Sequence, residues 1–125
     1  MKVLIADDEA SVRSALRLTL EQNGMSVAGE VVNSDEMMDW LKANDAHLLL
    51  VDWELPGKPV SRVIPSIRSQ NPALSIIVMN SRPQTRPTAL AAGANGFVCK
   101  GDPPEYLLDA MTKCRLDDRA ITQHT

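Results

Sequence analysis

Several polar residues that can take part in metal or phosphate chemistry each follow a short apolar run. They are Asp7, Asp8, Asp52, Asn80, Ser81 and Lys100, and the runs before them span residues 3–6, 48–51, 76–79 and 96–99. An ionised carboxylate is costly to bury unless it is paired with a cation or binds a metal. Each of these acids therefore either points into water or has a chemical function.

The chemistry that these residue types suit best is phosphoryl transfer. Clustered carboxylates repel one another unless a cation neutralises them, and Mg²⁺ typically takes one or two carboxylates, waters and a phosphate oxygen. Lys100 would add a point charge suited to a phosphoryl oxygen. A nucleophilic aspartate, a metal and a lysine together favour transfer of a phosphoryl group onto a carboxylate.

The elements that must position these residues are of two alternating kinds. The continuous apolar runs at 3–6, 48–51 and 76–79 are typical of strands covered on both faces. Residues 27–32 form an interrupted version that suits an edge strand, and 96–99 are a fifth candidate. Helical patterns span 10–22 and 60–69, follow the capping box at 33–36, and begin again at 103–104. Pro65 is expected to kink or shorten the helix at 60–69.

Strands that alternate with helices predict one α/β domain with a parallel sheet and helices on both faces. In such a sheet, ligands bind at the carboxyl ends of the strands, where the polar residues fall. If the strands at 3–6 and 48–51 are neighbours, the carboxylates of Asp7, Asp8 and Asp52 converge. Each feature alone is common, so the inference depends on their order along the chain.

The composition limits the classes of protein and partner. A chain of 125 residues that is 44% hydrophobic and 23% charged fits one domain with an aliphatic core. The net charge of −3 and the scattered arginines give no basic footprint, so no direct nucleic-acid binding is expected. No apolar stretch approaches the ~18 residues that span a membrane, and a signal-peptide pattern is missing, which favours a cytoplasmic location. Cys99 and Cys114 lack metal-site spacing and are expected to be reduced thiols.

On these residues the chain resembles the receiver domain of two-component response regulators. The resemblance covers residues 2–116 and rests on VLIADDEA, LLLVDWELPG, IIVMNS, LAAGANGFVCK and the final helix. It implies a flavodoxin-like, doubly wound sheet of five parallel strands in the order 2-1-3-4-5. The receiver domain would occupy residues 1–116, and residues 117–125 would be a polar C-terminal tail.

The resemblance also implies a role for each acidic residue. Asp52 would be the phosphoacceptor and would take its phosphoryl group from the phosphohistidine of a sensor histidine kinase or phosphotransfer protein. Mg²⁺ would be bound directly by Asp8 and Asp52, and largely through water by Asp7. The backbone carbonyl of Glu54 would complete the protein's share of the ligands, and its side chain would lie at the rim of the pocket.

The other implied positions include departures from the family's pattern. Lys100 would contact the acyl phosphate, but Gly101 follows it where the family usually has proline. The serine or threonine switch position falls on Asn80, although a shift of one residue would place Ser81 there instead. Phe97 matches the aromatic switch position, and plain core packing is the alternative explanation for it.

The segment SRPQTRPTALAAG, at 81–93, predicts a shortened fourth helix. Its prolines favour a loop over residues 81–86 and a helix of only about two turns from Pro87 to Gly93. In the family this region presents the signalling surface, so the shortening bears on output.

The leading prediction is a signalling switch that catalyses only its own phosphorylation and dephosphorylation, and is therefore not otherwise an enzyme. Phosphorylation would change the face between the fourth strand and the fifth helix, which would bind a downstream protein, with homodimer formation left open. The alternative is a receiver-like interaction module that acts without phosphorylation, which Asn80 and the shortened helix favour. A phosphohydrolase of the aspartyl-phosphate type fits poorly, because its nucleophile would lie in a DxD motif after the first strand. Whether the chain is a complete regulator or a fragment stays open.

Overall fold

The computed structural model describes the backbone of residues 1–123 and the side chains of residues 1–114. Five strands alternate with the helices along the chain. The strands are β1 (Lys2–Ala6), β2 (Ser26–Val31), β3 (Leu48–Asp52), β4 (Ser75–Asn80) and β5 (Gly96–Cys99). The helices are α1 (Ala10–Gln22), α2 (Ser34–Ala43), α3 (Val60–Gln70), α4 (Arg86–Ala92) and α5 (Pro104–Gln123), with a 3₁₀ turn, η1 (Pro83–Thr85), before α4.

The strands form one parallel sheet in the order β2-β1-β3-β4-β5, which confirms the predicted fold class. Every residue of β3 and β4 is buried, as their continuous apolar runs predict. The strand β2 lies at the edge, and most of its residues alternate between exposed and half-buried. Its single interior-facing glycine, Gly29, is required by close packing, because a Cβ there would lie 2.5 Å from Nε1 of Trp40 in α2.

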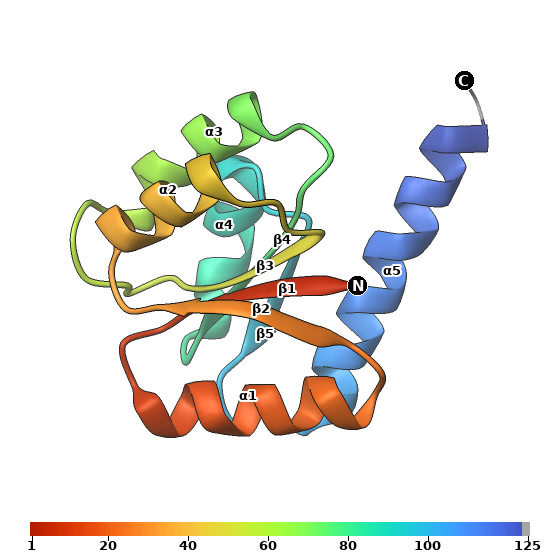
Figure 1. The fold of residues 1–125 in the computed structure, drawn as a ribbon, viewed down its shortest axis with the longest axis horizontal. Helices are drawn as coiled ribbons and strands as arrows, with labels where there is room; N and C mark the ends of the chain where they lie inside the picture. Colours follow the sequence, from red (N-terminus) through yellow and green to blue (C-terminus); the bar gives the residue numbers. More distant parts are fainter. Residues whose placement is uncertain (124–125) are drawn as a thin grey trace.

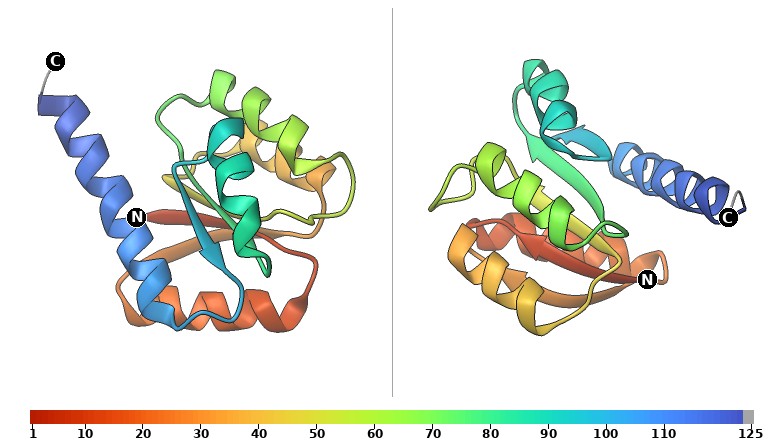
Figure 2. Two further views of the ribbon diagram at one scale, coloured as in Figure 1. Left: turned by 180° about the vertical axis from the view of Figure 1, so that it is seen from behind. Right: turned by 90° about the horizontal axis from the view of Figure 1, so that it is seen from above.

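Helices cover both faces of the sheet (Figures 1 and 2). Each face has its own core. Successive side chains of a strand point to opposite faces, so each strand contributes to both cores. The face covered by α1 and α5 receives Val3, Ile5, Leu48, Leu50, Ile77 and Met79. The face covered by α2, α3 and α4 receives Leu4, Ala6, Leu49, Val51, Ile76 and Val78.

Pro65 does not shorten α3, which runs from Val60 to Gln70 with the proline inside it. Of the two expected effects of Pro65, shortening is therefore absent, and a kink stays a prediction. A proline at this position removes the hydrogen bond to the carbonyl of Ser61. Both Pro65 and Ser61 are exposed, so water can bond that carbonyl. Meanwhile Ile64 and Ile67 are fully buried and keep the helix packed on the sheet.

The shortened fourth helix is present as the seven residues of α4, and it ends at Gly93 with a φ of +119°. Residues 83–85, expected to be loop, form η1 instead. The helix α5 continues to Gln123 and includes most of the predicted tail, while residues 124–125 lie outside the described residues. Its C-terminal part extends beyond the sheet (Figure 2). The boundary at residue 116 stays a prediction. Among the described residues, no helix has both the length and the apolar character needed to cross a membrane.

Candidate functional site

Acidic side chains from two neighbouring strands meet at the carboxyl edge of the sheet. Asp7 and Asp8 follow β1, Asp52 ends β3, and β1 pairs directly with β3. One carboxylate oxygen from each of these aspartates lies within 4.8 Å of the others. Asp7 is fully buried and Asp52 is 5% exposed, whereas Asp8 lies at the surface. The carboxylates therefore converge in the way that the strand order requires.

Lys100 reaches this cluster from the end of β5. Its Nζ lies 2.8 Å from Oδ2 of Asp7 and 3.1 Å from Oδ2 of Asp52. Burial of the ammonium group lowers the pKa of Lys100, but attraction to the two carboxylates outweighs burial, so the pKa is raised above its ordinary value. Lys100 is thus protonated at neutral pH and offsets part of the negative charge of the site.

The remaining carboxylate oxygens show how the acids are held. Oδ1 of Asp7 accepts a hydrogen bond from the backbone N–H of Glu9 at 2.9 Å. Oδ1 of Asp52 accepts one from the N–H of Glu54 at 3.0 Å. Oδ2 of Asp7 is buried and receives no hydrogen bond of good geometry, although Nζ of Lys100 lies close enough for an ion pair.

Oδ2 of Asp7 shares the ammonium of Lys100 with Asp52, so one positive charge serves two buried carboxylates. The carboxylates of Asp7, Asp8 and Asp52 together offer hard oxygen ligands that lie close to one another. This donor set fits a hard divalent cation. The side chain of Glu54 is exposed at the rim, and the role of its carbonyl as a ligand stays a prediction.

Glycine provides the turn that follows Lys100. The backbone N–H of Lys100 donates to the carbonyl of Asn80 at 2.8 Å, so pairing with β4 continues to the lysine itself. Gly101 then has a φ of +92°, a conformation in which residues with a side chain are strained. The lysine is therefore positioned by sheet pairing and a glycine turn, without the proline that usually follows it in the family.

Asn80 is the buried last residue of β4, and its side chain turns toward η1. The amide Nδ2 donates to Oγ1 of Thr85 at 2.8 Å, and Oδ1 accepts from the backbone N–H of Ser81, also at 2.8 Å. Asn80 is 3% exposed, whereas Ser81 lies beyond the strand at the surface. The buried strand-end position thus belongs to Asn80, while the switching role of either residue stays a prediction.

Phe97 lies in the core on the face covered by α2, α3 and α4 and is 3% exposed. The guanidinium of Arg86, at the start of α4, sits 5.4 Å from the centre of its ring. The same group donates to the carbonyl of Phe97 at 3.4 Å. This arrangement fits core packing, and the role of Phe97 as a switch stays a prediction.

Three residues without an assigned role in the sequence contact these positions: Thr85, Arg86 and Arg13. Thr85 and Arg86 both fall in the segment expected to be a loop, residues 81–86, where no periodicity marks them. Arg13 donates to the backbone carbonyl of Asp7 at 2.9 Å. Its place on the predicted helix at 10–22 puts it near the acids, but no pattern pairs it with a particular carbonyl.

Comparison with known proteins identifies the family. A family model described as the response regulator receiver domain matches residues 3–112. The transcriptional regulatory protein RcsB of Escherichia coli is 35% identical over an alignment of 117 residues that covers 89% of this chain and 54% of RcsB. The chain spans about half the length of the curated relatives it matches.

Solved structures agree with the family model. The isolated REC domain of RcsB from Salmonella enterica serovar Typhimurium, studied with the phosphomimetic BeF₃⁻, has a TM-score of 0.81 and 34% identity. The comparison covers 90% of this chain and 86% of that one. RcsB from the same organism, bound to the promoter rprA, also has a TM-score of 0.81, with 33% identity over 90% of this chain and 66% of that one.

The prediction that excluded nucleic acid from the partners is contradicted by the promoter complex of RcsB. That prediction rested on net charge and on the scattered arginines of these 125 residues. In the RcsB complex this chain matches only 66% of the protein. The charge of the matched part therefore does not report whether a protein that contains it binds DNA.

Proposed function

We propose, from the premise that this chain belongs to the receiver domain family of response regulators, that Asp52 accepts a phosphoryl group in a Mg²⁺-dependent reaction. The donor in this proposal is the phosphohistidine of a sensor histidine kinase or phosphotransfer protein. The observation that carries the proposal is the convergence of Asp7, Asp8 and Asp52 at the carboxyl edge of the sheet, where Lys100 contacts Asp7 and Asp52.

The chain's own residues suit each part of this transfer. The N–H of Glu54 and the ammonium of Lys100 hold the two oxygens of Asp52, so the nucleophilic carboxylate has a defined orientation. An oxygen of Asp52 forms the new P–O bond while the P–N bond to the donor's imidazole breaks, and the imidazole then takes up a proton. Lys100 is close enough to the reacting carboxylate to stabilise charge on the transferred group.

The acidic cluster supports a metal-assisted form of this reaction. Asp7, Asp8 and Asp52 would hold the ion, with the carbonyl of Glu54 as a further ligand. When bound, Mg²⁺ neutralises the carboxylates and the phosphoryl oxygens that must approach them. Without such neutralisation, Lys100 alone faces several negative groups.

The test is the intact mass of the protein after incubation with acetyl phosphate and Mg²⁺. We expect the wild type to gain one phosphoryl group, which hydroxylamine removes because an acyl phosphate is labile to it. Asp52→Asn should gain none, whereas Asp102→Asn, an exposed aspartate next to Gly101, should react like wild type. Phosphorylation of Asp52→Asn would refute the assignment. A wild type that is never phosphorylated would favour the alternative, an interaction module that works without phosphorylation.

The relatives support control of transcription as the output of a protein that contains this domain. RcsB is named a transcriptional regulatory protein, and one of its structures holds promoter DNA. In our proposal, phosphorylation of Asp52 changes the packing of the face between β4 and α5, and this change is passed to the partner or to the rest of such a protein. The cytoplasmic location expected from the sequence belongs to this proposal as well.

A further inference from the structure

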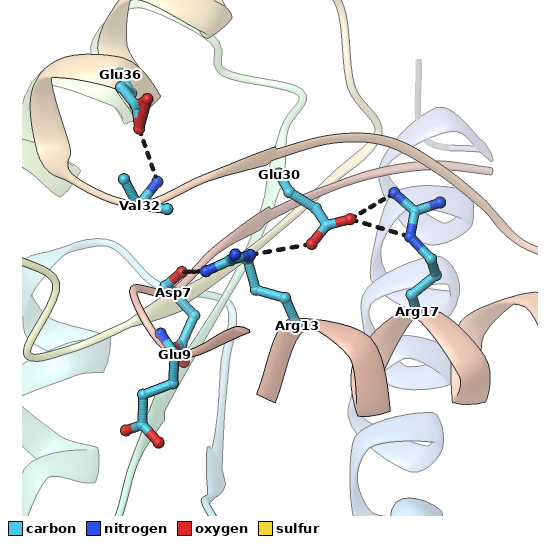
Figure 3. A network of polar contacts seen from close by, with 7 residues as sticks. All are labelled: Asp7, Glu9, Arg13, Arg17, Glu30, Val32 and Glu36. Atoms are coloured by element: carbon cyan, nitrogen blue, oxygen red, sulfur yellow. Dashed lines mark hydrogen bonds and ion pairs between the residues drawn. The ribbon is translucent and has the colours of Figure 1, made fainter. Parts of the chain in front are cut away.

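Arg13 of α1 links the acidic end of β1 to the edge strand β2 (Figure 3). One of its terminal nitrogens donates to the backbone carbonyl of Asp7 at 2.9 Å, and its Nε donates to Oε1 of Glu30 at 3.1 Å. The side chain of Arg13 is only 19% exposed. The other oxygen of Glu30 is held by Arg17, one helical turn further along α1, at 2.6 Å. Two nitrogens of the Arg13 guanidinium are thus each held by a hydrogen bond.

The carbonyl of Asp7 lies where the regular hydrogen-bonded pairing between β1 and β2 ends. The N–H of Asp7 still donates to the carbonyl of Val31 at 3.0 Å. Beyond Val31 the chain turns toward α2, and the N–H of Val32 donates to Glu36 of that helix, as Figure 3 shows. In a continued parallel ladder the carbonyl of Asp7 would accept a hydrogen bond from the N–H of Asn33, but Asn33 is the N-cap residue of α2 and does not extend β2. Arg13 therefore supplies the donor that a continued strand would have supplied to Asp7.

This carbonyl belongs to the peptide group that joins Asp7 to Asp8. Because a peptide group is planar, a fixed carbonyl also fixes the direction in which the chain enters Asp8. The side chain of Asp7 is buried and bonded to Glu9, so it has little freedom of its own. Asp8 lies at the surface, and rotation of the peptide before it would carry its carboxylate away from the cluster.

We propose that Arg13, oriented by Glu30, is a positioning residue for the metal-binding carboxylates. It holds the peptide between Asp7 and Asp8 so that the carboxylate of Asp8 faces those of Asp7 and Asp52. The inference rests on the proposed function, because it assigns a purpose to this geometry only if the cluster binds a cation.

Electrostatics alone predicts the opposite effect of removing Arg13, which makes the role testable. A positive charge near a cation site weakens cation binding, so loss of the guanidinium charge by itself would strengthen the binding of Mg²⁺. A positioning role predicts weaker binding when the guanidinium is lost. Arg13→Lys separates the two effects, because lysine keeps the charge but lacks the planar fork that bonds two partners at once.

The experiment is a titration of the metal-free protein with Mg²⁺, followed by the fluorescence of Trp53, which neighbours Asp52 in the chain. We expect Arg13→Lys and Arg13→Met to weaken binding by about tenfold, the lower end for residues that orient metal ligands. Arg17→Lys is the matched control: Arg17 lies on the same helix and bonds the same Glu30, but through the other oxygen. Its Mg²⁺ affinity should stay within about twofold of wild type.

Urea unfolding of each variant, without metal, separates positioning from folding. A positioning role requires that Arg13→Lys loses Mg²⁺ affinity and that Arg17→Lys keeps it, although the two variants lose a similar amount of stability. Equal affinity in wild type and Arg13→Lys would overturn the inference, as would tighter binding in Arg13→Met with no change in Arg13→Lys. If the wild type itself binds no Mg²⁺, the proposed metal-dependent function fails and takes this inference with it. Binding by wild type with unaffected Arg13 variants removes the inference alone.

Discussion

Lys100 is shared between two buried carboxylates, and this sharing defines the charge of the site. Its ammonium contacts Asp7 and Asp52, while Asp8 adds a third acid to the cluster. One ammonium cannot neutralise three carboxylates, so the site keeps a negative charge that favours a further cation. The same lysine lies at the end of β5, next to the turn at Gly101. Movement of that turn would therefore change the contact between Lys100 and Asp52.

A second feature at the scale of residues is that the side-chain amide of Asn80 already has a hydrogen-bond partner. The side-chain amide of Asn80 already donates to Thr85, and Phe97 is already buried. Phosphorylation should therefore create fewer new contacts in this protein than in one where a free hydroxyl moves to the phosphoryl group. We expect beryllofluoride, a phosphoryl mimic, to shift the amide NMR signals of residues 80–100 less in wild type than in Asn80→Thr. Thr88→Ser, an exposed change in α4, is the control. Equal or larger shifts in wild type would show that Asn80 couples the site as well as threonine does.

At the scale of elements, Arg68 joins α3 to the residues just before β4 and to the short connection between α4 and β5. Its guanidinium donates to the carbonyl of Gly93 at 3.0 Å, to the carbonyl of Leu74, and to Oδ1 of Asn95 at 2.6 Å. The same oxygen of Asn95 accepts from the N–H of Ile76. One side chain thus holds the end of α4 and the start of β4 and β5 against α3.

We therefore expect Arg68→Ala to lower the free energy of unfolding by roughly 2–3 kcal/mol, because it leaves several partly buried carbonyls without a donor. Arg62→Ala, an exposed change on the same helix, should cost less than about 0.5 kcal/mol. Urea denaturation at neutral pH measures both. A loss for Arg68→Ala no larger than that for Arg62→Ala would show that the contacts around Gly93 and Asn95 add little.

The contact of α1 with β2 predicts a pH dependence. The hydrogen bond from Arg17 lowers the pKa of Glu30 below its ordinary value, and Arg13 adds to this against a smaller opposing effect of burial. A carboxyl whose folded pKa is depressed contributes stability above its unfolded pKa of about 4.3, and the contribution is lost as the pH falls through the folded pKa. The stability of wild type minus that of Glu30→Gln should reach up to about 1 kcal/mol at pH 6 and shrink below about pH 4. A difference that grows on acidification would contradict this account.

At the scale of the whole molecule, the sheet separates two cores that meet only at the strands between them. The acidic cluster lies at the carboxyl edge, where the loops after β1, β3 and β5 come together. A ligand that binds this edge holds several strands and loops at once, so its binding free energy adds to the stability of the folded state.

Mg²⁺ should therefore raise the melting temperature of the whole domain. At a free concentration ten times its dissociation constant, a ligand that binds only the folded state adds about 1.4 kcal/mol, which corresponds to several degrees for a chain of this size. Chelation by EDTA should reverse the shift. Asp8→Ala should abolish most of the response, because few protein ligands hold the ion. An unchanged response in Asp8→Ala would remove Asp8 from the metal site.

Local sequence pattern by itself determined the type and succession along the chain of the strands and of most helices, and it placed the three aspartates at the strand ends, while the order of the strands in the sheet came from the family resemblance. The pattern could do so because a strand buried on both faces needs a continuous apolar run, and a parallel sheet collects its strand ends at one edge. Pattern alone did not decide the effect of Pro65 on helix length, because packing of the buried face of α3 outweighs one lost hydrogen bond. Composition also misled on nucleic acid, because charge reports only on the residues counted.

Only the tertiary structure decided which polar groups meet. The bonds from Asn80 to Thr85 and from Arg13 to Asp7 and Glu30 depend on side-chain rotamers and on the path of the chain after β4 and β2. The sharing of Lys100 between Asp7 and Asp52 depends on the register of β5 beside β4 and on the glycine turn at Gly101. No periodicity records such contacts, because each joins residues whose separation is set by packing and not by their spacing along the chain.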